Sequence, residues 1–414
     1  MPLKIAYVVM KYPTLSQTFI EREMRALAAL DVQVEVHPCL DFRRASAVEL
    51  PVPPELVVVR AGSAVGVILA GLAGAVRELA RRPGLLWPGM LMLWRHRPRH
   101  AEGWFHTLWG TWFALARAEE FRRRGPDVIH GAWATAPATV AAVLGELCGR
   151  PFSFGAHAYD LHRHGGDPFL APKLEVAKFV HTTTQTNVDD LKRRFPGRRA
   201  EIVLSRRGLP RLPELPVRAA SGSTGAELKI LSVGRLVPKK GHTFQIAACQ
   251  ELARRGVAFR LKIIGDGPLH AELAAAIAGA GLGAVVEMVG EQSPTETQAA
   301  YVWTDVFWHT GIVDAQGDRD GLPNVIPEAF AQGLPVVSSA AGGAGEAVID
   351  GQTGLIVDPA DTRALADAVE RLARDEALRR RLGAGGRAWV EANFLSDVNI
   401  RLLAEAFGRA AGAG

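Results

Sequence analysis

The sequence has few cysteines, no hydrophobic run long enough to cross a bilayer and no block of charge of one sign. Its 414 residues include only Cys39, Cys148 and Cys249, which are widely spaced and form no CxxC pair. A disulfide scaffold and a CxxC-type metal or redox motif are therefore excluded, and a reducing, cytoplasmic location is expected. The N-terminal apolar run leads into a charged amphipathic segment without a small-residue cleavage site, which predicts a buried first strand and not a signal peptide.

The charge is mildly basic, with a net charge of +5 and 22% charged residues of both signs. Such a balance suits phosphorylated substrates or anionic lipid, but it selects neither. Because no Lys/Arg run is interleaved with aromatic residues and no zinc-finger or RNA-binding signature occurs, no nucleic-acid partner is expected. The length exceeds what one hydrophobic core holds and predicts two domains.

Strand-like and helix-like segments alternate through two long stretches of the chain. The first stretch, 1–208, opens with a βαβ pattern, and the rhythm restarts in 228–388 after a linker at 209–227 rich in Pro and then in Ser, Gly and Ala. This alternation predicts two doubly wound α/β domains with parallel sheets. The last segment, 389–414, carries apolar residues at helical spacing and should form an amphipathic helix.

Residues 61–124 differ from the rest of the first stretch. A 15-residue apolar run, Gly62 to Val76, is followed by several tryptophans and many arginines. The run is shorter than the ~20 residues that span a bilayer. Two interpretations stay open: an interfacial helical insertion that docks on a membrane or a lipid-linked acceptor, or helices that pack on the sheet.

A cationic loop follows the first strand of the second stretch. Gly234 and Arg235 come directly after the apolar segment 228–233, and Lys240 precedes a helix. Glycines, cations and a helix N-terminus at the carboxyl end of a parallel strand are typical of a phosphate site, although a solvated basic loop has the same composition. After the next strand, Gly265 and Gly267 form either a ligand-contacting loop or a plain tight turn.

An acidic pair lies further along. Asp320 precedes a short segment in which Pro323 suits the first turn of a helix, and Glu328 falls about one turn inside that helix. The two carboxylates can accept hydrogen bonds from sugar hydroxyls while the amides between them take a phosphate. The segment that carries those amides is Gly321, Leu322, Pro323, Asn324 and Val325, of which Pro323 has no N–H to donate.

Taken together, these motifs resemble the retaining glycosyltransferases of family 4. The order is GRLxxxKG at 234–241, GDGP at 265–268, DGxPxxxxEA at 320–329 and GLPVV at 333–337. KYPTLSQTFI at 11–20 and GAHAYD at 155–160 are similar to enzymes of bacterial exopolysaccharide assembly, such as colanic-acid and amylovoran glycosyltransferases. The resemblance implies the GT-B architecture, with two Rossmann-like domains facing each other across a cleft and the C-terminal helix crossing back to the N-terminal domain.

The resemblance also implies roles for single residues. Arg235 and Lys240 would neutralise the donor diphosphate, Glu328 would bind the ribose, and Asp320, where the family usually has Glu, would contact the donor sugar. His157 would lie beside the reacting sugar, so the expected catalytic set is His157, Arg235, Lys240 and Asp320. Ser16, Gln17 and Thr18 resemble acceptor-side loop residues. His130, at the end of a strand, either touches the acceptor or is a packed structural histidine.

The expected activity is retaining transfer of a hexosyl unit from a UDP-sugar or GDP-sugar to a lipid-linked or oligosaccharide acceptor. No carboxylate offers itself as a nucleophile, so front-face departure and attack is expected. The spacing of Asp314, Asp318 and Asp320 invites a metal site, but the architecture implies metal-independent transfer, and no metal or cofactor is expected. A peripheral contact with the cytoplasmic face of the inner membrane is possible for such an enzyme. The alternatives are an epimerase or phosphorylase on the same scaffold, and a non-catalytic sugar-nucleotide-binding assembly protein.

Overall fold

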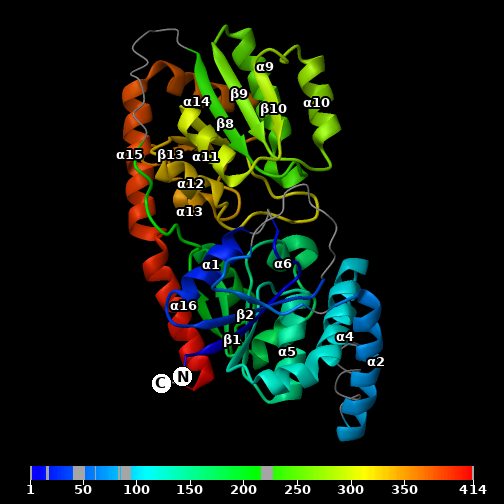
Figure 1. Ribbon diagram of the computed structural model, residues 1–414. Coiled ribbons are helices and arrows are strands. Elements are labelled where there is room, and N and C mark those ends of the chain that lie inside the picture. The colour runs from blue at the N-terminus through cyan, green and yellow to red at the C-terminus, as the bar shows by residue number, and fades with distance from the viewer. Residues whose placement is uncertain are drawn as a thin grey trace. The chain divides into compact units, whose positions relative to one another are not determined.

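The computed structural model describes residues 2–14, 18–40, 52–60, 62–82, 84, 95–215 and 227–412. It divides into two compact units (Figure 1), of which the first comprises 1–183, 187–208 and 396–414 and the second 184–186 and 209–395. Each unit is built on one parallel sheet with helices between the strands. The predicted fold class, two doubly wound α/β domains, is confirmed.

The first unit contains a seven-stranded sheet in the order β3-β2-β1-β4-β5-β6-β7, with every neighbouring pair parallel. Its central strands are apolar and buried on both faces, as the strands of a sheet covered by helices must be. Its strands are β1 Lys4–Val9, β2 Gln33–Pro38, β3 Val57–Val58, β4 Val128–Gly131, β5 Phe152–Gly155, β6 Phe179–Thr182 and β7 Glu201–Leu204. Its helical segments are α1 Thr18–Ala28, α2 Ala64–Arg81, α4 Ala101–Arg124, α5 Ala136–Cys148, α6 Tyr159–His162, η3 Arg163–Gly165, α7 Leu170–Val176, most of α8 Gln185–Arg194, and α16 Ser396–Ala411.

The second unit contains a six-stranded parallel sheet in the order β10-β9-β8-β11-β12-β13. Its strands are β8 Leu228–Val233, β9 Phe259–Ile264, β10 Val286–Gly290, β11 Val306–His309, β12 Val336–Ser338 and β13 Gly354–Ile356. Its helical segments are η4 Pro238–Lys240, α9 His242–Arg254, α10 His270–Gly279, α11 Pro294–Trp303, α12 Val325–Ala331, α13 Ala344–Ala347, α14 Thr362–Arg374 and α15 Glu376–Asn393.

Both sheets reverse their winding beside their first strand. In the first unit β1 lies between β2 and β4, and in the second unit β8 lies between β9 and β11. The loops after the two flanking strands leave in opposite directions at such a switch point, which opens a crevice at the carboxyl ends of the strands. Each unit therefore has one topologically favoured place for a ligand.

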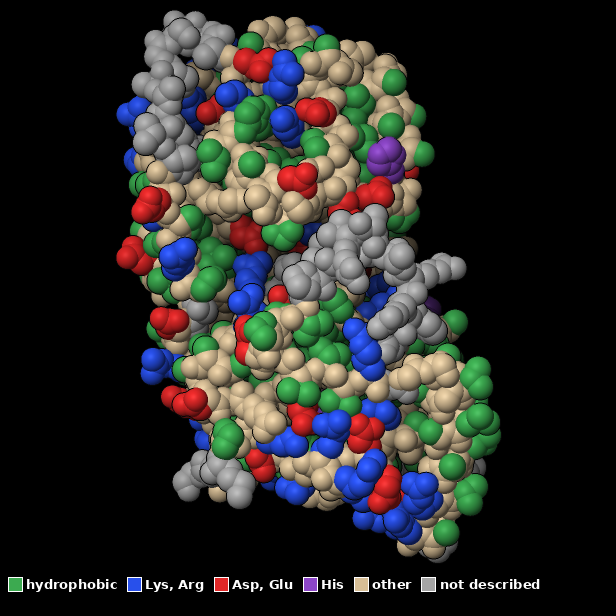
Figure 2. Space-filling view, viewed as in Figure 1, with side chains coloured by type: hydrophobic (Ala, Val, Ile, Leu, Met, Phe, Trp, Pro, Cys, Tyr) green, Lys and Arg blue, Asp and Glu red, His purple; other side chains and the backbone are tan. Residues whose placement is uncertain are grey.

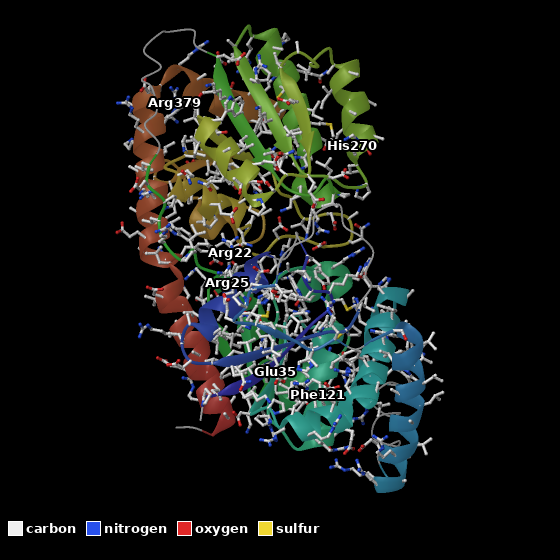
Figure 3. The ribbon with its side chains drawn as sticks, in the orientation of Figure 1. Arg22, Arg25, Glu35, Phe121, His270 and Arg379 are labelled. Carbon is white, nitrogen blue, oxygen red and sulfur yellow. The ribbon has the colours of Figure 1, made fainter. Side chains whose placement is uncertain are left out.

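The insertion forms an outer layer on the first unit. Phe121 of α4 is buried against His37 of β2, with ring centroids 4.5 Å apart, so α4 covers the sheet (Figure 3). α2 packs mainly on α4, where Gly71 and Gly74 let it approach Trp112 and the backbone of Leu115, and Val67 reaches the core cluster beside the sheet. The expectation that these helices pack on the sheet thus fits α4, whereas α2 is a second layer.

α2 and α4 run in the same direction, since positions 71, 74 and 78 of α2 meet positions 112, 115 and 122 of α4 in turn. Arg122 donates two hydrogen bonds to the buried carboxylate of Glu78, at 2.7 and 2.8 Å. This contact holds the C-terminal ends of α2 and α4 together. No helix in the described parts of the chain has both the length and the apolarity needed to cross a membrane.

The C-terminal segment was expected to be one amphipathic helix from 389, and this is wrong. α15 ends at Asn393, and a new helix, α16, begins at Ser396 and belongs to the first unit. The prediction that the C-terminal helix crosses back to the N-terminal domain is therefore confirmed. Ile400 and Phe407 of α16 are buried in the core beneath β1, β4 and β6, whereas Val398 is 69% exposed. The helix is interrupted at 394–395 because the side chain of Phe394 packs in the core of the second unit.

Candidate functional site

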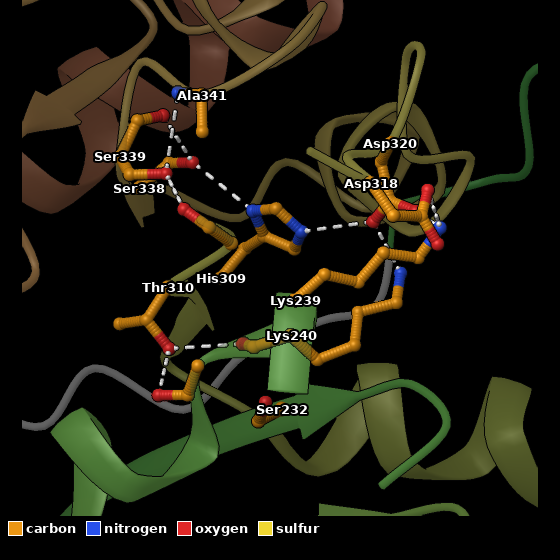
Figure 4. A network of polar contacts seen from close by, with 12 residues as sticks. Ser232, Lys239, Lys240, His309, Thr310, Asp318, Asp320, Ser338, Ser339 and Ala341 are labelled. Carbon is orange, nitrogen blue, oxygen red and sulfur yellow. Dashed lines mark hydrogen bonds and ion pairs between the residues drawn. The ribbon is translucent and has the colours of Figure 1, made fainter. Parts of the chain in front are cut away.

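Two lysines and two aspartates meet at the switch point of the second sheet (Figure 4). Lys239 and Lys240 lie in the η4 turn after β8, and Asp318 and Asp320 lie in the loop after β11. The Nζ atom of Lys240 is 2.6 Å from Oδ2 of Asp320, and Nζ of Lys239 is 3.0 Å from Oδ1 of Asp318 and 3.3 Å from Oδ1 of Asp320. The cationic loop and the acidic loop therefore form one network, although 80 residues separate Lys240 from Asp320.

Asp320 is the centre of this network. Burial alone would raise the pKa of its carboxyl group, but Lys240, His309 and Lys239 reverse this effect and hold the pKa well below its ordinary value. Nε2 of His309 lies 3.9 Å from Oδ2 of Asp320, and its Nδ1 lies 3.3 Å from Oγ of Ser338. Asp320 is thus an anion at neutral pH, and it orients both lysines at the edge of the sheet.

Two glycines are needed for the tight packing of these loops. Gly241 has φ of 67° and lies against the backbone carbonyl of Thr310, whose hydroxyl donates a 2.9 Å hydrogen bond to the Gly241 carbonyl. Gly265 has φ of 136° and lies against the carbonyl of Gly234. A side chain at either position would collide with backbone, so glycine is required where the loops after β8, β9 and β11 lie against one another.

The other predicted residues of the β8 and β9 loops lie at the same edge. Gly234 adjoins the aliphatic stem of Lys240, and Gly267 lies against the backbone of Leu236. Arg235 is exposed, and its guanidinium group has no hydrogen bond or ion pair with any residue that the structure describes. Its guanidinium group is therefore free to meet a ligand anion at this edge.

Glu328 lies on a helix that begins later than expected. α12 begins at Val325, with Asn324 before it, so Pro323 precedes the helix and does not lie in its first turn. Glu328 is half-buried, and the hydroxyl of Tyr301 lies 3.3 Å from its Oε2 atom. Glu328 and Asp320 therefore lie at opposite ends of the short segment that contains the amides from Gly321 to Val325.

That segment is supported from the loop after β12. The amide of Gly343 donates a 3.0 Å hydrogen bond to the carbonyl of Gly321, and Gly342, with φ of 62°, lies against the carbonyl of Asp320. Leu322 is buried in the core and anchors the segment from below. The backbone from 320 to 325 is thus held by packing on both sides, which suits a preorganised ligand contact.

In the first unit, His157 follows β5 and is 2% exposed. Neither ring nitrogen has a hydrogen-bond partner among the described residues, although the backbone carbonyl accepts a 2.8 Å hydrogen bond from Asn187. Burial, followed by Arg207, His181 and His130, holds the pKa of His157 well below its ordinary value, so the ring is neutral at pH 7. A neutral imidazole with two unsatisfied nitrogens can both donate to and accept from a hydroxyl.

A buried carboxylate with several polar neighbours lies beneath His157. Glu23 of α1 accepts a hydrogen bond from Tyr7 and lies 3.4 Å from Nε2 of His181. Burial would raise the pKa of Glu23, but His181, Arg207 and Tyr7 lower it to about 2. The Arg207 guanidinium stacks 3.9 Å above the ring of Phe19. These groups form the buried layer beneath His157 at the switch point of the first sheet.

His130 is a packed residue and does not reach the surface. It is 0% exposed in β4, its Nδ1 lies 2.8 Å from Oγ of Ser153, and its ring contacts Tyr7 and Phe407. Its side chain points to the face of the sheet that α16 covers, which the alternation of side chains along a strand decides. The interpretation as an acceptor contact is therefore not supported, and the structural alternative holds.

The remaining acceptor-side residues are placed only in part. Ser16 and Gln17 lie outside the described residues, and Thr18 is the first residue of α1. Across the described ranges, no three His, Cys, Asp or Glu side chains are grouped in a way that could hold a metal ion. Asp318 of the aspartate series is instead paired with Lys239.

Sequence reasoning missed several residues of both sites. Lys239 is the neighbour of Lys240 and lies in the same tight turn before Gly241, so its place at the site could have been predicted from the sequence. His309 and Tyr301 had no local signal, because each reaches the site only through the pairing of β11 with its neighbours or the packing of α11. Glu23 and Arg207 lie far apart in sequence and meet only in the folded unit.

Comparison with known proteins finds a family and relatives that match part of this chain. Residues 216–389 match the family model described as glycosyl transferases group 1. The chain is 38% identical over 184 residues to the amylovoran biosynthesis glycosyltransferase AmsK of Erwinia amylovora, covering 44% of this chain and 45% of that protein. It is 39% identical over 170 residues to the putative colanic acid biosynthesis glycosyltransferase WcaL of Escherichia coli, covering 41% of each. The matches span less than half the length of these relatives.

Solved structures show the same fold over the whole chain. Sucrose-phosphate synthase of Thermosynechococcus elongatus matches with a TM-score of 0.74 at 22% identity, covering 100% of both chains. Anabaena HepE, solved in complex with UDP-glucose, matches with a TM-score of 0.70 at 16% identity, covering 98% of this chain and 100% of that one. The fold is that of the GT-B glycosyltransferases, and residues 216–389, which match the group 1 glycosyltransferase family model, contain the lysine–aspartate network.

Proposed function

We propose that this protein is a retaining glycosyltransferase of exopolysaccharide biosynthesis that transfers a hexosyl unit from a nucleoside diphosphate sugar to a lipid-linked or oligosaccharide acceptor. The observation that carries the proposal is the network of Lys239, Lys240, Asp318 and Asp320 at the switch point of the second sheet. The names of the matched relatives and the UDP-glucose complex of the structural neighbour support the same substrate class.

The donor diphosphate binds at the carboxyl edge of β8. Arg235 is exposed and its guanidinium group has no partner among the described residues, and Lys240 is held by Asp320 at 2.6 Å with 14% of its side chain exposed. An arriving diphosphate competes with Asp320 for the Lys240 ammonium group and adds the fork of Arg235. The glycines at 234, 265 and 267 let the backbone approach the phosphates closely.

The rest of the donor lies along the segment from Asp320 to Glu328. Glu328, with Tyr301 beside it, binds the ribose hydroxyls, and the supported backbone from Gly321 to Val325 contacts the sugar and the phosphates. Asp320 has two roles: it positions Lys240, and its carboxylate accepts from a sugar hydroxyl. The first role explains why a side chain one methylene shorter than Glu serves here, because Lys240 and Lys239 reach toward it.

Transfer takes place by departure and attack on the same face of the sugar, without a metal ion. The carboxylates placed near the donor are committed, Asp320 to the lysines and Glu328 to the ribose, so neither is assigned as nucleophile. The leaving phosphate takes the proton of the acceptor hydroxyl, while Arg235, Lys239 and Lys240 stabilise its growing negative charge. His157, as a neutral imidazole, hydrogen-bonds a hydroxyl beside the reacting carbon.

The test is a transfer assay that reports both the product and its anomeric configuration. The protein is incubated with UDP- and GDP-hexoses and an extract-derived lipid-linked acceptor, and the product is analysed by NMR. A new glycosidic bond with the anomeric configuration of the donor is expected. Epimerised donor in an incubation without acceptor would instead support an epimerase, and donor binding without any transfer would support a non-catalytic protein.

A further inference from the structure

A cavity of about 360 Å³ opens in the first unit beside α4. It is lined by the segment 95–100 that leads into α4, by the first residues of α4, and by the loop of α6, η3 and α7. The lining contains five arginines and four histidines against three acidic residues. This excess of cationic and imidazole groups has no part in the donor site, which lies in the second unit.

The three acidic residues of the lining are already engaged. Asp167 is buried and pairs with the Nζ atom of Lys173 at 2.9 Å, and Glu102 pairs with Arg163 at 3.4 Å. Asp160 is buried and accepts hydrogen bonds from three backbone amides, at 2.8 to 3.1 Å. None of these carboxylates neutralises the arginines of the segment 95–100.

Arg97 and Arg99 are therefore available to a ligand. Both are exposed at the cavity, and neither makes a hydrogen bond or an ion pair within the described parts of the chain. Pro98 between them is buried against Gly103, which fixes the backbone from which the two side chains leave. α4 also begins here, and its cap residue His100 makes no side-chain hydrogen bond to the helix. Two guanidinium groups and a helix N-terminus at one cavity favour a ligand with several anionic oxygens.

Apolar side chains adjoin the cavity on the same helix. Trp104, Phe105 and Leu108 are 37%, 46% and 54% exposed, and they are interspersed on α4 with the lining residues Gly103 and His106. Because α2 runs parallel to α4, its amino-terminal half, with Leu69 60% exposed, lies at this same end. Figure 2 shows hydrophobic side chains gathered along the edge of the first unit where α2 lies. A cationic cavity beside an apolar surface matches an anionic headgroup that carries an acyl or prenyl chain.

We propose that this cavity binds a phosphate or diphosphate group, and that the group belongs to the lipid-linked acceptor. Arg97 and Arg99 contact the phosphate oxygens, and the exposed side chains of α2 and α4 contact the first part of the lipid chain. Asp160 connects this cavity to the acceptor side of the first unit, because its carboxylate also accepts a hydrogen bond from the backbone amide of His157. The assignment to an acceptor rests on the proposed function, whereas phosphate binding in the cavity does not.

The experiment measures binding of farnesyl diphosphate, inorganic pyrophosphate and glucuronate to the full chain by calorimetry. The double variant Arg97→Gln with Arg99→Gln is compared with Arg123→Gln, an exposed arginine at the other end of α4 that has no partner among the described residues. Lys240→Ala controls for phosphate binding at the donor site. Farnesyl diphosphate affinity is expected to fall at least tenfold in the double variant and to stay within twofold of wild type in Arg123→Gln, whereas Lys240→Ala removes only the share of diphosphate binding that belongs to the donor site.

The outcomes separate the proposals. Tighter binding of farnesyl diphosphate than of pyrophosphate supports a lipid-linked group, and equal binding, lost together in the double variant, supports a free phosphate group. Equal affinity of the double variant and Arg123→Gln, or binding of glucuronate as tight as that of pyrophosphate, would overturn the phosphate site. Nucleotide-sugar binding should be unchanged in the double variant. Its absence from wild type would overturn the proposed function and leave the cavity site standing. Should the double variant melt early, each single variant is measured in its place, with a severalfold loss expected.

Discussion

At the switch point of the second sheet two lysines meet two aspartates, whereas at that of the first sheet an uncharged imidazole lies over the buried carboxylate of Glu23. The side chains of Lys240 and Asp320 are 14% and 18% exposed, so a ligand anion can reach the lysine. Glu23 and His181 are buried, and His157 presents neutral nitrogens that no described residue satisfies. Under the proposed function, the same topology serves a phosphate in one crevice and hydroxyl groups in the other.

The largest effect should come from the cationic side of this comparison. Lys240→Ala removes a charge that stabilises the leaving phosphate, and kcat/KM should fall about 100-fold. Steady-state kinetics with a saturating acceptor measures the loss. The matched control is Lys262→Ala, a lysine of β9 paired only loosely with Glu287 at 3.9 Å. Full activity in a folded Lys240→Ala variant would contradict the assignment of the network to the donor diphosphate.

A smaller effect is expected at the neutral side. His157→Ala removes one hydrogen bond to a substrate hydroxyl, which corresponds to about a 10-fold loss of kcat/KM. His130→Ala should instead lower the melting temperature, because it opens a cavity in a core and removes the partner of Ser153. Melting curves and kinetics of the two variants, measured together, test this division. Equal activity losses for the two folded variants would remove the distinction drawn between these histidines.

The smallest effect is on the pH dependence of stability. The pKa of Glu23 is lowered from 4.5 to about 2, so the ionised carboxylate stabilises the folded state above pH 4.5, and this contribution is lost as the pH falls from 4.5 towards 2. The contribution is on the order of 1 to 3 kcal/mol, since one pKa unit corresponds to about 1.4 kcal/mol. Urea unfolding of wild type and Glu23→Gln between pH 6 and 3 measures it. The two free energies of unfolding should converge at low pH, and a constant difference would contradict this contribution of the buried carboxylate.

Much of the fold followed from the sequence because its signals are local. The apolar segment Leu228–Val233 coincides with β8, and the alternation of strand-like and helix-like segments through 228–388 is that of the second unit. The end of the chain did not follow, because the helical pattern continues across residues 394–395, and only the packing of Phe394 in the second unit breaks it. Local periodicity cannot show a helix break that tertiary packing imposes.

The candidate site was predicted residue by residue but not as a network. Lys240 and Asp320 each stood out by motif, yet their ion pair depends on the adjacency of β8 and β11, which no local signal contains. Whether His130 is packed or lines the site depends on the face of β4 to which its side chain points. The sequence of a four-residue strand does not show which face that is. His309 was missed because its role lies entirely in its distance from Asp320.

Donor binding tests the central claim most directly. The melting temperatures of wild type and Lys240→Ala are measured against rising concentrations of UDP- and GDP-sugars, because a ligand that binds the folded state stabilises it increasingly above its Kd. At least one nucleotide sugar should raise the melting temperature of wild type, and the shift should shrink strongly in Lys240→Ala but not in Lys262→Ala. Equal shifts in all three proteins, or none with any nucleotide sugar, would contradict the account.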